Sequence, residues 1–238
     1  MARNQAQAKQ QRRRDATATR QEILATATRQ FVEKGFDGTR IDEIAEAAGV
    51  NKRMLYVYFG NKEALYLQVL ETQLDRVLDI RRPPEQRSVD PREEAETVIR
   101  RYFHFLAENP QFVRLVTWEF LGGAQRAQRV LAERAAKGLE ELHEVLRAGI
   151  AAGQFRSDLD VGRLVLSVNA MCIGQFTHRP VAEAFWKQDL STSQALEATL
   201  DHLVKLVFEG ICVSAAPARS ARDSVRPASG ARGAGVKK

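Results

Sequence analysis

Apolar side chains recur at the spacing of an α-helix almost throughout residues 19–213, and this periodicity restricts the chain to helical folds. Ile23, Ala27 and Phe31 are four residues apart and precede Gly35, a residue type that favours a helix end. No segment alternates between apolar and polar residues, as a half-buried strand would. The sequence therefore predicts an all-α protein of about nine helices. The expected segments lie near 23–34, 41–48, 51–58, 62–80, 92–108 and 110–121, followed by a long helix ending at 153 and by 158–172 and 196–211.

Length and composition are those of an ordinary globular protein. The 238 residues suffice for one or two domains with a substantial core, and the hydrophobic fraction of 44% is typical. No run reaches the roughly 18 apolar residues of a membrane helix, and the N-terminus lacks the apolar block of a signal peptide. We therefore expect a cytoplasmic protein with no membrane partner. Cys172 and Cys212 lack CxxC spacing, which indicates free thiols rather than a disulfide or a zinc site.

Residues 39–62, TRIDEIAEAAGVNKRMLYVYFGNK, have the spacing of two short helices that meet at a tight turn. Such a turn needs a small residue facing the partner helix, a residue free to adopt positive φ, and an apolar residue that fixes the second helix. Ala45, Gly49 and Leu55 stand at these positions. The pattern is that of a helix-turn-helix, and it predicts a DNA-binding domain over residues 19–66.

The second helix of this pair presents cations and an aromatic hydroxyl on one face. Asn51 is a candidate N-cap, which leaves Lys52, Arg53 and Tyr56 outward at helical spacing. A helix N-terminus with exposed cations suits the major groove of DNA. The alternative is an ordinary surface helix with solvated Lys and Arg, which the complete turn pattern disfavours.

Residues 20–66 resemble the DNA-binding domain of the TetR family of transcriptional regulators. The resemblance is carried by Gly35-Phe36, Thr39, Ile44-Ala45, Ala48-Gly49-Val50, Leu55-Tyr56, Tyr58-Phe59 and Lys62. It implies that Tyr56 and Lys62 contact phosphates, and that Lys52 and Arg53 lie where base-reading residues lie. The predicted DNA-contacting residues are Arg40, Asn51, Lys52, Arg53, Tyr56, Tyr58 and Lys62.

Three positions depart from the common family pattern. Arg40 stands where a second Thr is usual, Asn51 replaces a frequent Ser, and Arg53-Met54 replaces a frequent Gly-Thr pair. Arg40 offers an added phosphate contact, whereas Met54 lacks a hydroxyl that often contacts DNA. Because of these differences, the resemblance does not predict the operator sequence.

Positive charge is concentrated at the two ends of the chain. Residues 1–20 and residues 214–238 each carry a net charge of +5, so the part between them carries −4 of the total of +6. Both ends have low complexity, and we expect residues 1–18 and 214–238 to be disordered basic segments. A solvated tail without function is the default at either end. We favour phosphate or minor-groove contacts for the N-terminal segment alone, since it directly precedes the helix-turn-helix.

Residues 67–213 are too many merely to support a short DNA-binding unit. They resemble the ligand-binding and dimerisation domain of the family, chiefly in helix number and in residues 152–160. In that family the last two long helices of each subunit form a four-helix dimer interface. The resemblance thus predicts two stripes at a homodimer interface, with packing inside one chain as the alternative. The stripes are Val161, Leu164, Val168 and Cys172, and Leu196, Leu200, Leu203 and Val207.

A ligand pocket is expected among the central helices, because a site for a small molecule needs apolar walls with a few polar anchors. Each aromatic residue there is also a candidate for ordinary core, and each histidine for a surface residue. The residues expected to line the pocket are Phe103, Phe112, Trp118, Glu119, Asn169, Cys172, Phe176 and His178, with Phe105, Phe120, Met171 and Gln175 as further candidates.

These features predict a homodimeric repressor that binds palindromic operator DNA and is released by a small-molecule effector. Such a dimer would place two reading helices about 34 Å apart, in successive major grooves. A ligand-independent activator or an architectural DNA-binding protein is the alternative. A helical enzyme is more remote, because the four histidines form no HExxH and no nucleotide-binding or nucleophile motif is present. We expect no cofactor and no metal.

Overall fold

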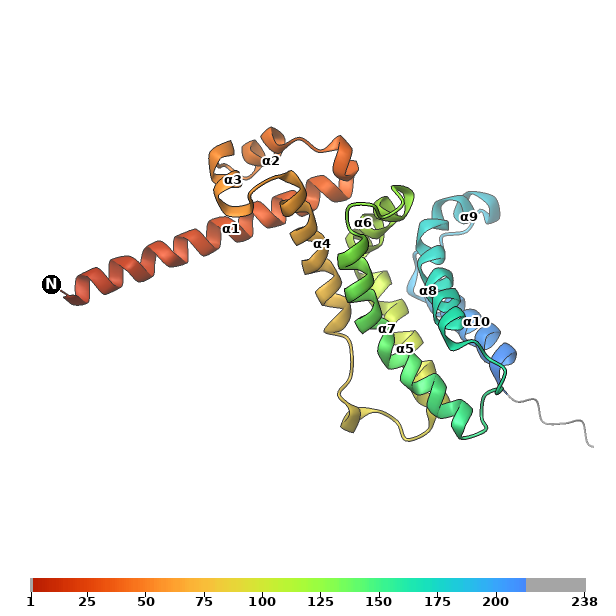
Figure 1. Ribbon diagram of the computed structural model, residues 1–238. Helices are drawn as coiled ribbons and strands as arrows, with labels where there is room; N and C mark the ends of the chain where they lie inside the picture. The colour runs from red at the N-terminus through yellow and green to blue at the C-terminus, as the bar shows by residue number, and fades with distance from the viewer. Residues whose placement is uncertain (1, 213–238) are drawn as a thin grey trace, which may run out of the picture.

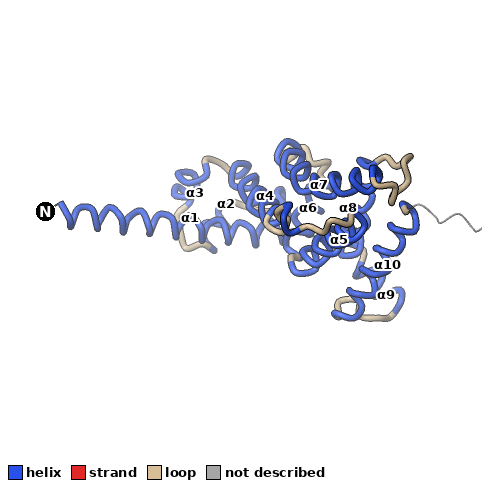
Figure 2. Tube along the Cα trace, turned by 90° about the horizontal axis from the view of Figure 1, so that it is seen from below, coloured by secondary structure: helices blue, strands red, loops and turns tan. Residues whose placement is uncertain are grey.

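The computed structural model describes residues 2–212, without the side chains of residues 2–15, 131 and 135. This part of the chain contains ten α-helices, a short 3₁₀ helix at Pro84–Gln86 and no strand, apart from one isolated bridge between Phe155 and Cys212 (Figures 1 and 2). No helix in it is long and apolar enough to cross a membrane. The helices are α1 (Ala2–Gly38), α2 (Ile41–Ala47), α3 (Lys52–Phe59), α4 (Lys62–Leu78), α5 (Pro91–Glu108), α6 (Pro110–Leu121), α7 (Gln128–Ala151), α8 (Val161–Thr177), α9 (Arg179–Trp186) and α10 (Ser193–Ile211).

The all-α prediction is confirmed, and the helix that the sequence analysis missed is α9. This helix has only eight residues, with a proline in its first turn. Its large apolar residues Val181, Phe185 and Trp186 are all exposed, so they form no stripe against the core. A short helix without a buried face gives little periodic signal, so the sequence predicts no helix over this segment.

The structure differs from the disorder expected over residues 1–18, because α1 begins at Ala2. The segment is rich in Ala, Gln, Arg and Lys, which are among the best helix formers. It also continues a helix that is already nucleated and packed further along, so each added residue contributes a hydrogen bond without a new nucleation cost. The first turns of α1 extend well beyond the rest of the molecule (Figure 1). The other segment expected to be disordered, 214–238, lies outside the described residues.

Two apolar cores organise the described chain. The N-terminal core gathers side chains of α1, α2, α3 and the first half of α4 around Phe31 and Tyr66. The larger core gathers side chains of α5 to α8 and α10. Helix α4 contributes to both, with Leu70 in the first and Leu74 in the second. Helix α4 therefore runs without interruption across the expected domain boundary at residues 66 and 67, and it contributes to both cores.

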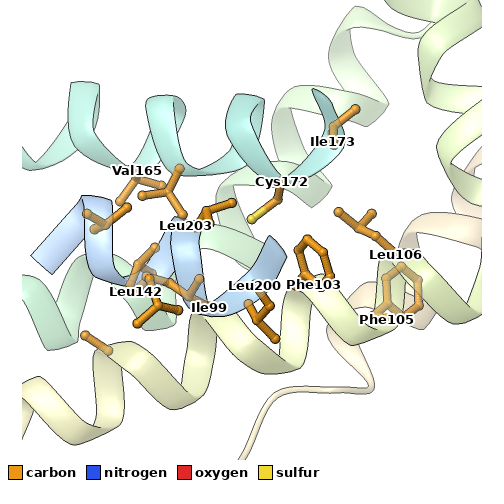
Figure 3. Close-up of a cluster of buried hydrophobic side chains, with 14 of the residues drawn as sticks. Ile99, Phe103, Phe105, Leu106, Leu142, Val165, Cys172, Ile173, Leu200 and Leu203 are labelled. Atoms are coloured by element: carbon orange, nitrogen blue, oxygen red, sulfur yellow. The ribbon is translucent and has the colours of Figure 1, made fainter. Parts of the chain in front are cut away.

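The stripes expected at a dimer interface lie mostly within one chain. Val168, Cys172, Leu200, Leu203 and Val207 are all buried in the larger core. Figure 3 shows Cys172 of α8 and Leu200 and Leu203 of α10 in one cluster with side chains of α5. The intrachain alternative is therefore the correct one for these residues. They were misassigned because a helix that packs on both sides carries two apolar faces, and a sequence does not say which face meets a partner.

The corner between α7 and α8 is fixed by an aromatic residue on a loop. Phe155 is buried, and its ring lies so close to Gly149 of α7 that a Cβ at that position would overlap it. The backbone N–H of Arg156 donates to the carbonyl of Ile211 at 2.9 Å, which ties the same corner to the end of α10. The close approach of the Phe155 ring explains why a glycine, Gly149, occurs within the last turns of a long helix.

Candidate nucleic-acid interface and ligand cavity

The turn between α2 and α3 has the geometry that the sequence predicted. Gly49 adopts φ 65°, a conformation that favours glycine. Its N–H donates to the carbonyl of Glu46 at 3.1 Å, and the N–H of Val50 donates to the carbonyl of Ala45 at 3.0 Å. This hydrogen-bond pair is the Schellman arrangement, which ends α2 sharply. Leu55 is buried beneath the turn and fixes α3 against its neighbours.

Helix α3 is capped and presents one exposed face. The side chain of Asn51 accepts a hydrogen bond from the N–H of Met54 at 2.9 Å, as predicted for an N-cap. Arg53 and Tyr56 are exposed on this helix. So is Val57, with 73% of its surface accessible. Val57 is not among the DNA-contacting residues that the sequence predicts, although its place four residues after Arg53 puts it on the same face.

Lys52 is also exposed, but it is not free. Its Nζ lies 2.9 Å from a carboxylate oxygen of Asp42 on α2. The hydrogen bond to Asp42 raises the pKa of Lys52. Lys52 therefore braces the start of α3 against α2 and remains cationic at the edge of the exposed face.

The remaining residues expected at DNA lie around this face in different settings. Arg40 is exposed in the loop before α2, whereas Tyr58 is partly buried against the N-terminal core. Lys62 begins α4, and its Nζ lies 4.3 Å from the centre of the Phe36 ring. Burial lowers the pKa of Lys62. The structure thus holds Lys62 by a cation–π contact inside its own domain, which the sequence did not indicate.

The two domains meet where α6 packs on α1 and α4. Gly35 bends α1 with φ 68° and ψ −178°, and a Cβ there would come within 3.1 Å of the Trp118 ring. The indole N–H of Trp118 donates to the carbonyl of Val32 at 3.2 Å. The hydroxyl of Tyr66 on α4 donates to the carboxylate of Glu119, and burial raises the pKa of this hydroxyl. Trp118 and Glu119 therefore join the domains, and they line a separate hollow of about 360 Å³ at this junction instead of the cavity among α4 to α8.

A cavity of about 140 Å³ lies between the end of α4 and helices α5 to α8. Its walls are mainly apolar. Of the eight residues that the sequence predicts for the pocket, Phe112 and Asn169 line it, as does the further candidate Phe120. The hydroxyl of Tyr102 donates to Asn169 Oδ1 at 2.7 Å across the space between α5 and α8. The other apolar lining residues are Leu74, Val77, Ile80, Val98, Ile99, Val116, Leu139, Leu142, Val165, Val168 and Ile173.

The other predicted pocket residues lie elsewhere. Phe103 and Phe176 pack against each other in the core, with ring centres 5.0 Å apart. Cys172 is buried beside them, and burial raises the pKa of its thiol to about 12. His178 is exposed at the junction of α8 and α9, where its Nδ1 lies 2.9 Å from the carbonyl of Gly174. These residues have packing or capping roles instead of a place in the cavity wall.

The sequence analysis missed the charged part of the cavity wall, which consists of Arg81, Arg101, Arg134 and Glu141. Glu141 is buried, and it accepts a hydrogen bond from Arg101 at 2.9 Å. Charged residues are usually assigned to the surface, and the pairs here come from different helices. Only the packing of α5 on α7 brings them together, so the sequence held no local signal for them.

A cluster of largely buried ion pairs adjoins this wall at Glu141. Arg82 donates two hydrogen bonds to the buried carboxylate of Glu94, at 3.0 and 2.7 Å. Arg87 lies 3.3 Å from Glu141 and 2.9 Å from the exposed Glu144. The cluster links the α4–α5 connection to α5 and α7, so it fixes the end of the cavity nearest α4.

The helix-turn-helix and the hollow helical body define a class of protein, namely a DNA-binding regulator with a separate sensing domain. Comparison with known families agrees with this class. Residues 23–69 match the family described as bacterial regulatory proteins of the tetR family, and residues 91–207 match the tetracyclin repressor-like C-terminal domain. The two matches together span most of the chain, which belongs to the TetR family of transcriptional regulators.

Individual relatives and structures support the same assignment. The chain is 29% identical over 202 residues to the transcriptional repressor NicS of Pseudomonas putida, which covers 84% of this chain and 95% of the relative. It is 29% identical over 203 residues to the transcriptional regulator RutR of Escherichia coli, covering 84% and 93%. A transcriptional regulator from Streptomyces coelicolor superposes with a TM-score of 0.60 at 26% identity, covering 81% and 98%. The regulator FadR of Bacillus subtilis, in complex with stearoyl-CoA, superposes with a TM-score of 0.63 at 22% identity, covering 80% and 98%.

Proposed function

We propose that this protein is a repressor that binds a palindromic operator as a homodimer and leaves it when a small molecule occupies the cavity. The observation that carries the proposal is the exposed face of α3, held by the capped and fixed turn after α2. Arg53 on this face has the donors to recognise a guanine edge, and Val57 suits a thymine methyl group. Tyr56 and Arg40 flank the face and are suited to phosphate contacts.

The homodimer interface is proposed on the outward side of α8 and α10, extended by α9. These helices lie on the side of the body away from α1 to α3 (Figure 1). Their exposed apolar residues are Leu166 on α8, Leu206 on α10 and three residues of α9, of which Phe185 is 80% exposed. Such an exposed apolar surface marks an interaction site, and the family resemblance points to a second copy of this chain.

We propose that α4 and α6 couple ligand binding in the cavity to release from DNA. Both helices line the cavity, α4 through Leu74 and Val77 and α6 through Phe112 and Val116. Helix α4 begins within the DNA-binding domain, and α6 contacts that domain through the Tyr66–Glu119 and Trp118–Val32 hydrogen bonds. A ligand that favours another arrangement of these helices would change the spacing of the two reading helices, and the effect is limited by its differential affinity for the two states. The stearoyl-CoA bound to FadR, a protein of the same fold, supports a small-molecule effector.

The ligand-independent activator or architectural protein remains the second candidate. One relative, 33% identical over 97 residues, is the transcriptional activator FasR of Mycolicibacterium smegmatis. The cavity among α4 to α8 favours the ligand-responsive alternative, since an architectural protein has no use for it.

The proposal is tested by selecting bound duplexes from a random-sequence DNA library and comparing Arg53→Ala with the wild type. We expect Arg53→Ala to lose roughly 5- to 150-fold in affinity for the selected sequence and to discriminate less at one base position. The matched control is Arg129→Ala, which removes a cation that is exposed on α7. Unchanged discrimination in Arg53→Ala, or no sequence enriched by the wild type, would refute the reading role of α3.

A further inference from the structure

The cavity has one wall unlike the others. Helices α6 and α8 contribute apolar residues and Asn169, whereas all four charged residues come from α5, α7 and the connection that follows α4. Three of these are the guanidinium groups of Arg81, Arg101 and Arg134, and one is the carboxylate of Glu141. The residues of this wall therefore include more positive than negative groups. The three guanidinium groups differ in how they are paired.

Two of the three guanidinium groups are engaged with protein acceptors. Arg101 donates to the carbonyl of Ile80 at 2.6 Å and to Glu141 at 2.9 Å. Arg134 forms an ion pair with Asp75 of α4. The donors of these two side chains are largely used, so they shape the wall more than they offer a free binding group.

Arg81 is different. Its nearest carboxylate is that of Glu140, at 3.7 Å, which is beyond hydrogen-bond distance and largely exposed to solvent. A guanidinium has five N–H donors, and an exposed ion pair at this separation contributes little. Arg81 lies in the connection after α4, three residues beyond its last residue Leu78, and its side chain is only 28% exposed. It thus places free donors at the cavity wall.

A second guanidinium of this wall, that of Arg101, has one donor without an acceptor. The Nε of Arg101 is buried and has no hydrogen-bond acceptor in the described part of the chain. A buried donor without an acceptor is costly, and its positive end is not neutralised by the pair that Arg101 makes with Glu141.

We propose that the cavity binds a small amphipathic organic anion, namely an apolar ring or short chain with a carboxylate, and that Arg81 binds the acid group. The inference rests on the proposed function of the cavity as the effector site. Guanidinium and carboxylate match in a paired, charge-assisted geometry. The volume of about 140 Å³ is close to the roughly 150 Å³ of an engineered cavity that holds benzene, which limits the apolar part to about one or two rings. Because Arg81 follows α4, the acid group would be bound at the helix that leads to the DNA-binding domain.

The experiment compares two probes that share a ring system and differ in head-group charge. Binding of 2-naphthoate and of 2-naphthamide to the full-length protein is measured by titration calorimetry near neutral pH. We expect wild type to bind the carboxylate at least roughly tenfold more tightly than the carboxamide, because a hydrogen bond to a charged group contributes more than a neutral one. In Arg81→Gln the affinities should become similar through loss of carboxylate binding alone.

Three further variants make the result specific to Arg81. Arg81→Lys keeps the charge and should restore part of the preference, whereas Glu140→Gln removes the competing carboxylate and should tighten naphthoate binding by roughly twofold. Arg129→Gln makes the same charge change at an exposed position outside the cavity and should bind both probes as wild type does. Thermal unfolding of each variant checks that the body is folded.

The proposal is overturned if neither probe binds wild type, if the carboxamide binds as tightly as the carboxylate, or if Arg81→Gln weakens both equally. These outcomes are separate from the proposed function, which is judged by sequence-selective DNA binding without any ligand. A protein that fails to bind DNA but prefers the carboxylate would refute the repressor and keep the anion site.

Discussion

The two domains use basic residues in opposite ways. On α3, Lys52 and Arg53 lie on the outside, and the ion pair of Lys52 with Asp42 joins two exposed side chains. In the body, Arg87 and Arg101 lie against the buried carboxylate of Glu141 between helices. Exposed ion pairs contribute little to folding, whereas a buried pair becomes costly when one partner is removed. The cations on α3 are therefore exposed to an external partner such as DNA, whereas those in the body mostly stabilise the fold.

The largest expected effect is on the body. Glu141→Ala leaves Arg87 without a buried counterion and Arg101 with only Glu94 at 3.8 Å, and we expect it to lower the free energy of unfolding by about 3 kcal/mol. The control is Glu144→Ala, because Glu144 also pairs with Arg87 but is exposed; it should cost no more than about 1 kcal/mol. Urea denaturation measures both. Equal effects of the two variants would show that burial does not distinguish these pairs.

A second contrast compares two glycines. Gly149→Ala would force the Phe155 ring from its buried position, and we expect a loss of about 1–3 kcal/mol in unfolding free energy. Gly49→Ala meets no atom within 4 Å and suffers only from its positive φ, so it should lose about 1–2 kcal/mol. Thermal unfolding of both variants provides the comparison. If Gly149→Ala proves neutral, the packing at the α7–α8 corner is looser than described.

On the DNA-binding side, charge removal should affect binding instead of folding. Lys52→Ala removes a pair between exposed residues, so the unfolding free energy should change by less than about 1 kcal/mol. Its affinity for all duplexes should fall together, and the slope of log affinity against log salt should flatten by about one unit if Lys52 meets a phosphate. Fluorescence anisotropy at several salt concentrations gives the slope. An unchanged slope would remove Lys52 from the DNA interface.

The smallest expected effect is a pH dependence at the start of α5. The Gln154 side chain and the N–H of Arg92 both donate to Asp90, each at 3.0 Å, and these hydrogen bonds hold the pKa of Asp90 below its ordinary value. A depressed pKa contributes stability that is present above the pKa of the unfolded chain and is lost as pH falls through the folded value. Asp90→Asn should therefore flatten the acid side of the stability profile. Identical profiles below pH 5 would contradict this role.

The DNA-binding domain was largely predictable from the sequence because its constraints are local. Gly49, Leu55 and Asn51 act within a few residues of one another, and their spacing alone defines the turn and the cap. Val57 was missed because an apolar residue is normally assigned to a core. Lys62 was assigned to DNA by family resemblance, and only the folded domain shows its contact with Phe36.

The body was predictable only in its helices. The charged cavity wall forms only where α5, α7 and the connection after α4 pack together. Residue spacing within one helix does not predict which helices pack together. Trp118 and Phe103 were expected at the ligand because an aromatic residue on an apolar face fits a pocket and a core equally well. The structure places Trp118 at the domain junction and Phe103 in the core.

The central claim, that two copies of α3 read one duplex in a fixed geometry, is tested most directly by changing the distance between half-sites. Once a bound palindrome has been selected, five base pairs are inserted at its centre, and ten in a second duplex. Five base pairs place the second half-site on the opposite side of the DNA, about half a helical turn away. The account predicts that this insertion reduces binding of the dimer to the level of a single half-site. Affinity that is unaffected by the five-base-pair insertion would contradict it.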